Sequence, residues 1–87
     1  MKELLNMTIE ESSELIQACC KYKRWIKGDY TLRDDNGSIV ENLKEEIVDV
    51  YNMLLQLRDK MFIDDKEFYT LLGIKMFRTE ELKNNKK

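Results

Sequence analysis

Apolar residues recur at steps of three and four along the middle of this chain, and that spacing constrains the fold more than any other feature. The run comprises Val40, Leu43, Ile47, Val50, Leu54, Leu57 and Met61. Alternating steps of three and four place side chains on one face of a helix that packs lengthwise against near-parallel neighbours. A shorter run of Leu15, Ala18, Tyr22 and Trp25 has the same spacing. The chain also lacks proline, so long helices can continue without interruption, and we predict an all-α fold.

Local signals for helix ends divide the chain into three predicted helices. Capping-box spacing marks three starts, at Thr8–Glu11, Ser38–Glu41 and Asp64–Glu67. Gly28 is a typical stop for the first helix, and the polar segment 28–37 that follows predicts a loop. The third helix contains Gly73, which weakens it, and we expect it to fray into the polar tail 83–87.

The length of the chain bears on its assembly. Its 87 residues allow one domain, 1–87, in which residues 8–78 form the core. Two helices of about 20 residues and a shorter third one cannot enclose a core by themselves. Two such hairpins docked face to face make a four-helix bundle. We therefore expect a helical hairpin plus a third helix that forms a four-helix-bundle core on dimerisation, with a homotetramer as the alternative.

Composition excludes several classes of function. The 15 basic and 17 acidic residues give a net charge of −2, which argues against a nucleic-acid partner. The absence of histidine excludes histidine triads, His-ligated zinc and the Glu-x-x-His di-iron motif. Cys19 and Cys20 are adjacent, which is typical of reduced thiols rather than of a disulfide. No apolar run is long enough for a signal peptide or a membrane span, so we expect a cytoplasmic protein without a membrane partner.

Two acidic pairs lie one helical turn apart within the two best-defined helices. They are Glu11 with Glu14, and Glu46 with Asp49. Like charges at this spacing repel each other. Continuing the first apolar run backwards from Leu15 reaches Glu11, which therefore points to the interior, while Glu46 and Asp49 lie at the edge of the second run. Four carboxylates converging between two helices suit a hard divalent cation. The alternative is a solvated acidic face on a charge-rich protein.

The sequence order of these acids resembles that of a known family. Residues 11–14 (Glu-Ser-Ser-Glu) and 46–49 (Glu-Ile-Val-Asp) resemble the paired ExxE and ExxD motifs of the all-α NTP pyrophosphohydrolases, the MazG-like family. The segments Ile9–Arg24 and Glu41–Leu57 are similar to the two core helices of its small phage and Firmicute members. Lys75-x-x-Arg78 resembles the basic pair on their third helix, so the likeness extends from residue 8 to residue 78.

This resemblance implies a reaction and a set of site residues. The reaction is hydrolysis of a nucleoside triphosphate between the α- and β-phosphates, giving the monophosphate and pyrophosphate, in nucleotide-pool house-cleaning. Mg²⁺, or Mn²⁺ in its place, would be held by the four acids, and Glu14 is the expected catalytic group that orients or deprotonates water. The sequence has no Walker A glycine loop, so side chains must hold the substrate. The candidates are Lys23, Arg24, Asn52, Lys75 and Arg78.

Each of these assignments has an alternative. The basic residues can be ordinary solvated charge or favourable partners of a helix C-terminus. The loop 28–37 can be a lid that brings Arg33 to the substrate, or a plain connector. A different class of function also remains open, namely a non-catalytic helical dimer that acts as an interaction or regulatory module.

Overall fold

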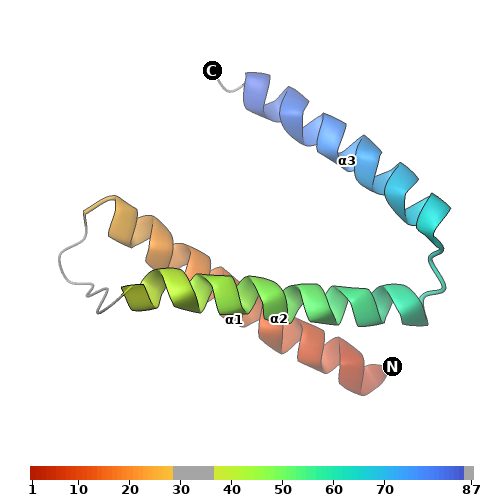
Figure 1. Cartoon of the computed structure of the whole chain (residues 1–87), viewed down its shortest axis with the longest axis horizontal. Helices are drawn as coiled ribbons and strands as arrows, with labels where there is room; N and C mark the ends of the chain where they lie inside the picture. Colours follow the sequence, from red (N-terminus) through yellow and green to blue (C-terminus); the bar gives the residue numbers. More distant parts are fainter. Residues whose placement is uncertain (29–36, 86–87) are drawn as a thin grey trace.

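The computed structural model of the chain describes residues 1–28 and 37–85 (Figure 1). It contains α1 (Lys2–Ile26), α2 (Ser38–Lys60) and α3 (Asp65–Asn85), with no strand in these two ranges. The predicted all-α class is therefore confirmed. The predicted lid and its Arg33 fall in residues 29–36, outside the described part of the chain.

The helices α1 and α2 form a hairpin and pack against each other, crossing at an angle (Figure 1). The face of α1 that lies against α2 contains the predicted apolar run and its backward extension, which together are Leu4, Thr8, Glu11, Leu15, Ala18, Tyr22 and Trp25. Ala18 is only 2% exposed. Among the described residues, Ala18, Ile39 and Met53 are the only buried hydrophobic side chains, so the core of a single chain is thin.

The orientation of α2 differs from the prediction. Leu43, Val50 and Leu57 of the predicted run are partly buried, whereas Ile47, Leu54 and Met61 are more than half exposed. The face of α2 that lies against α1 is instead centred on Ile39, Glu46 and Met53, which are spaced seven residues apart. The apolar surface of α2 is wider than one neighbouring helix can cover, so three of the seven residues of the predicted run are left at the surface.

One of the three predicted helix starts is wrong, and a second is right in position but has a different cap. α1 begins at Lys2, so Thr8 lies inside the helix and its Oγ1 donates a 2.7 Å hydrogen bond to the Leu4 carbonyl. At α2 the N-cap is Gly37, with a left-handed φ of 76° and no side-chain cap. Only Asp64 acts as predicted, because its Oδ1 accepts a 2.8 Å hydrogen bond from the Glu67 amide at the start of α3.

The predicted end of α1 is confirmed, and the predicted end of α3 is not. Gly28 follows α1 with a φ of +82°, a left-handed conformation that favours glycine. α3 passes through Gly73 without interruption and includes Lys83, where fraying was expected to begin.

An elbow at residues 61–64 joins α2 to α3, which leaves the hairpin at an angle (Figure 1). Arg58 holds this elbow: its Nε donates a 3.2 Å hydrogen bond to the Ile63 carbonyl, and its guanidinium pairs with Asp65. The same guanidinium lies 4.4 Å from the centre of the Phe68 ring. In the described ranges, packing of one helix along another is confined to α1 and α2, and every α3 residue after Phe68 is exposed.

Candidate functional site

Three carboxylates meet where α1 and α2 pack together. Glu11 and Glu14 come from one face of α1, and Glu46 comes from the middle of α2. Each residue contributes a carboxylate oxygen that lies within 4.8 Å of the others. Glu11 and Glu46 are partly buried between the helices, while Glu14 is exposed at their edge. The cluster therefore has an enclosed floor and an open side.

Two of these oxygens lack any hydrogen-bond partner. Oε2 of Glu11 and Oε2 of Glu46 are both removed from solvent with no donor beside them. A buried polar atom without a partner is costly and is rare in native proteins. A divalent cation would satisfy both oxygens, and a ligand set made only of carboxylates suits Mg²⁺ or Mn²⁺. The residues present therefore fit a hard metal ion.

The electrostatic effects within the cluster all raise the pKa values of Glu11 and Glu46. Desolvation is the largest effect that raises the pKa of Glu11 above its ordinary value of 4.5, followed by repulsion from Glu14, Asp49 and Glu46. The pKa of Glu46 is also raised, first by desolvation and then by repulsion from Glu14 and Asp49. A hydrogen bond with Glu14, which forms only when one of the two acids carries a proton, adds to both shifts. Protonation of one acid or binding of a cation would reduce this repulsion.

Asp49 stands slightly apart from the other three acids. It is exposed on α2, outside the group whose oxygens lie within 4.8 Å of one another. Its charge nonetheless raises the pKa of both Glu11 and Glu46, so it faces the same space. Glu14 and Asp49 thus form the open edge of the site, one from each helix.

The candidate substrate-binding residues lie at different distances from this cluster. Lys23 and Arg24 occupy the last turn of α1, and nine residues separate Lys23 from Glu14, about 14 Å along the helix axis. Asn52 follows Asp49 by one turn, and its Oδ1 accepts a 3.3 Å hydrogen bond from Gln56 Nε2. Lys75 and Arg78 are exposed on α3, which does not pack on the hairpin of its own chain in the part of the chain described.

The inward position of Glu46 was missed in the sequence, although a signal for it exists. Glu46 is seven residues from both Ile39 and Met53, the two most buried side chains of α2. Glu11 is likewise seven residues from Leu4 and from Ala18. A spacing of seven residues keeps side chains on one face of a packed helix. Both glutamates therefore occupy positions where an apolar residue is expected.

Comparisons of the chain with protein-family models, with curated proteins and with solved structures gave no match. Across residues 1–28 and 37–85, none of the helices has the length and apolar character needed to cross a membrane.

The raised pKa values predict how the stability of the metal-free protein depends on pH. Glu11 and Glu46 hold protons more tightly in the folded chain than in the unfolded chain. Their contribution to stability is therefore complete below the ordinary glutamate pKa of 4.5 and is lost as the pH rises through their raised values. Thermal unfolding in a chelator should give a melting temperature that falls over this range. In the Glu46→Gln variant the fall should be smaller, and an equal fall would contradict the assignment.

Proposed function

We propose that this chain is a Mg²⁺-dependent nucleoside triphosphate pyrophosphohydrolase, which converts a (d)NTP and water to the (d)NMP and pyrophosphate in nucleotide-pool house-cleaning. One observation carries the proposal. Both carboxylates of the ExxE pair and the Glu46 carboxylate of the ExxD pair meet within 4.8 Å, and Glu11 and Glu46 have buried oxygens without partners. Helices in a pure scaffold would gain stability from apolar residues at positions 11 and 46.

The chemistry assigned to each acid follows from its exposure. Glu11, Glu14 and Glu46, with Asp49 beside them, would hold the ion, which when bound offsets charge on the phosphate oxygens. Glu14 is the exposed member of the three and is open to water at the edge of the cluster. It can therefore orient the attacking water and accept its proton as the anhydride bond breaks.

Substrate contacts are proposed on two sides of the cluster. Asn52 lies on the same side of α2 as Asp49 and can reach a base or sugar. Lys23 and Arg24 are at the periphery, about three turns from the acids, where they suit phosphates that extend away from the ion. Lys75 and Arg78 would need α3 to approach a hairpin, either its own or that of a second copy.

Assembly and location belong to the same proposal. A homodimer would complete a four-helix bundle from two α1–α2 hairpins, with a homotetramer as a further step. The enzyme would act in the cytoplasm without a nucleic-acid partner. The alternative is a non-catalytic interaction module. The exposed apolar residues of α2 and α3 would be covered in either case, so they do not favour one function over the other.

Titration with a metal ion distinguishes the pyrophosphohydrolase from the non-catalytic interaction module. With Mg²⁺ or Mn²⁺ at about a hundredfold excess over its dissociation constant, the free energy of unfolding should rise by about 2.7 kcal/mol. In a domain of this size the melting temperature should then rise by roughly 10 °C or more. A scaffold would show almost no change. Pyrophosphate release should accompany the shift in a screen of canonical and modified (d)NTPs, and a metal-stabilised protein that releases none would contradict the proposed reaction.

A further inference from the structure

A narrow polar stripe continues from the acid cluster along α2. In residues 47–57 the only charged or amide side chains are those of Asp49, Asn52 and Gln56. Their spacing of three and four residues places them on one face of the helix, and all three are exposed. The stripe ends seven residues beyond Asp49, about 10.5 Å along the helix axis. It therefore leads from the candidate metal site towards the end of α2.

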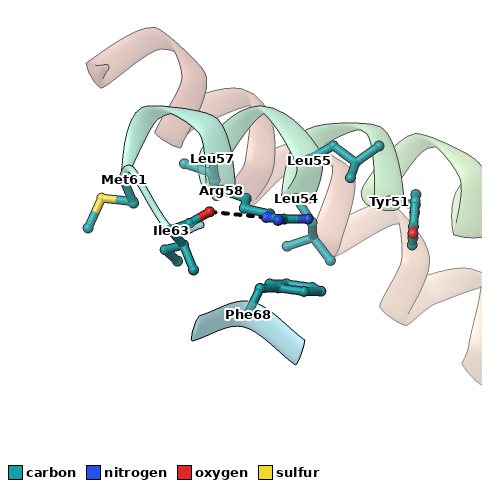
Figure 2. A pocket seen from close by; sticks show the side chains of 8 residues that line it. All are labelled: Tyr51, Leu54, Leu55, Leu57, Arg58, Met61, Ile63 and Phe68. Atoms are coloured by element: carbon teal, nitrogen blue, oxygen red, sulfur yellow. Dashed lines mark hydrogen bonds between the residues drawn. The ribbon is translucent and has the colours of Figure 1, made fainter. Parts of the chain in front are cut away.

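Exposure alone does not account for these polar residues. In the same stretch, side chains that are between 47% and 65% exposed but apolar or aromatic are Val48, Tyr51, Leu54 and Leu55. On the side of α2 away from the stripe, Tyr51 and Leu54 help to line an apolar hollow of about 290 Å³ that reaches Phe68 of α3 (Figure 2). Charged and amide groups are thus confined to the stripe, although other exposed positions surround it.

A hydrogen bond joins the two amides of the stripe. Gln56 Nε2 donates to Asn52 Oδ1 at 3.3 Å. Such a pair one turn apart adds slightly to helix stability, and here it also determines which groups the two side chains offer to a ligand. Because Oδ1 faces Gln56, Asn52 presents Nδ2 as a donor, while Gln56 presents Oε1 as an acceptor. In the described ranges of the chain, neither of these two atoms has a hydrogen-bond partner of its own.

The direction of the stripe determines which end of a nucleotide would meet this pair. In the proposed function, on which this step rests, the phosphates lie at the acids and extend towards Lys23 and Arg24 at the end of α1. Because α1 and α2 run in opposite directions in the hairpin (Figure 1), the nucleoside would extend the other way, along the stripe. Asn52 lies about 4.5 Å beyond Asp49 along the helix axis, and Gln56 about 10.5 Å beyond it. Asn52 would therefore meet the sugar side of the base, and Gln56 the side further from the sugar.

We propose that Asn52 and Gln56 recognise the Watson–Crick edge of the base and select the bases that carry an outer amine, cytosine and adenine. On this edge of both bases, a ring nitrogen that accepts lies on the sugar side of an amine that donates, which matches Nδ2 of Asn52 and Oε1 of Gln56 in that order. In uracil, thymine and guanine the ring N–H donates and the outer carbonyl accepts, so donor would meet donor and acceptor would meet acceptor. A site built to hydrogen-bond one pattern of polar groups rejects the reversed pattern.

The test measures pyrophosphate release from dCTP, dATP, dUTP, dTTP and dGTP with Mg²⁺. For dCTP and dATP, kcat/KM should exceed that for the other three by about tenfold or more, as expected for two exposed hydrogen bonds. Gln56→Met removes the outer acceptor and the contact that orients Asn52, so it should raise KM for dCTP and dATP, leave kcat unchanged and abolish the preference. Asn84→Leu, near the end of α3, is the control and should keep the full preference.

A second variant reverses the proposed pattern. Asn52→Asp can still accept from Gln56, but it offers an acceptor where Nδ2 was a donor, so the preference should move towards dUTP, dTTP and dGTP. Loss of structure would slow all five substrates and would not reverse their order. Equal kcat/KM for all five in the wild type, or an unchanged preference in both variants, would overturn the role of the amide pair and leave the proposed reaction standing.

Equilibrium binding of dCMP and dUMP with Mg²⁺ provides a measurement that does not need turnover. Tighter binding of dCMP by the wild type, lost in Gln56→Met, would support the amide pair even if no pyrophosphate were released, and only the proposed reaction would then be contradicted. Equal binding of the two monophosphates, or no binding of either, would contradict the amide pair. Without pyrophosphate release, that result would overturn both proposals.

Discussion

Glu11→Gln or Glu46→Gln should reduce pyrophosphate release by about 10³-fold while raising the melting temperature of the metal-free protein. The fall in activity and the rise in melting temperature have the same cause. Each side chain adds a negative charge to a desolvated cluster whose members repel one another. Glutamine removes that charge and keeps the shape, so the fold gains stability and the site loses a metal ligand. Stabilisation by Mg²⁺ should decrease together with the activity.

Glu10→Gln is the matched control for these variants. Glu10 precedes Glu11 on α1 but is exposed and lies outside the group of converging carboxylates. Its replacement should leave both the rate and the metal-dependent rise in melting temperature unchanged. Full activity in Glu11→Gln or Glu46→Gln would refute the carboxylate site, whatever the control shows.

The second large effect is expected at Met53. This side chain is 5% exposed on the face of α2 that lies against α1, and it is one of the three residues of the thin core. Met53→Asp removes an apolar contact worth about 2–5 kcal/mol and adds a buried carboxylate without a partner. A domain of this length has only about 4–13 kcal/mol of total stability. Circular dichroism should therefore show loss of the cooperative thermal transition.

Asn52→Asp controls for the added charge in this experiment. Asn52 is the preceding residue and is exposed, so the same carboxylate there stays in water. Its melting temperature should change by only a few degrees. A folded Met53→Asp protein with an unchanged transition would show that the α1–α2 contact contributes little to stability.

The sequence predicted the buried face of α1 better than the buried face of α2, for a physical reason. On α1, one apolar run lies on the side that faces α2, so the spacing of that run identifies the inner face of the helix. Extending the run backwards correctly predicted that Glu11 lies on this face. On α2, Ile39 and Met53 compete with Ile47 and Leu54 for the inner position. Spacing alone cannot choose between adjacent apolar faces on one helix, because the choice depends on which neighbour is present.

Local signals for helix starts were less reliable for a similar reason. Thr8 and Ser38 can cap a helix, but residues 2–7 also favour helix, and Gly37 takes the cap position before Ser38. The convergence of the acids between the two helices was predicted, but the inward position of Glu46 was not. The spacing of seven residues that links Glu46 to Ile39 and Met53 contained that information in the sequence.

The clustering of Glu11, Glu14 and Glu46 within one hairpin has a consequence for how the assembly of such an enzyme could change. Every acid of the cluster comes from one hairpin, so each chain would bring a whole site to an assembly and share none of its acids with a neighbour. A substitution among the exposed apolar residues of α2, such as Ile47 or Leu54, could then change how many copies associate without moving any carboxylate of the site.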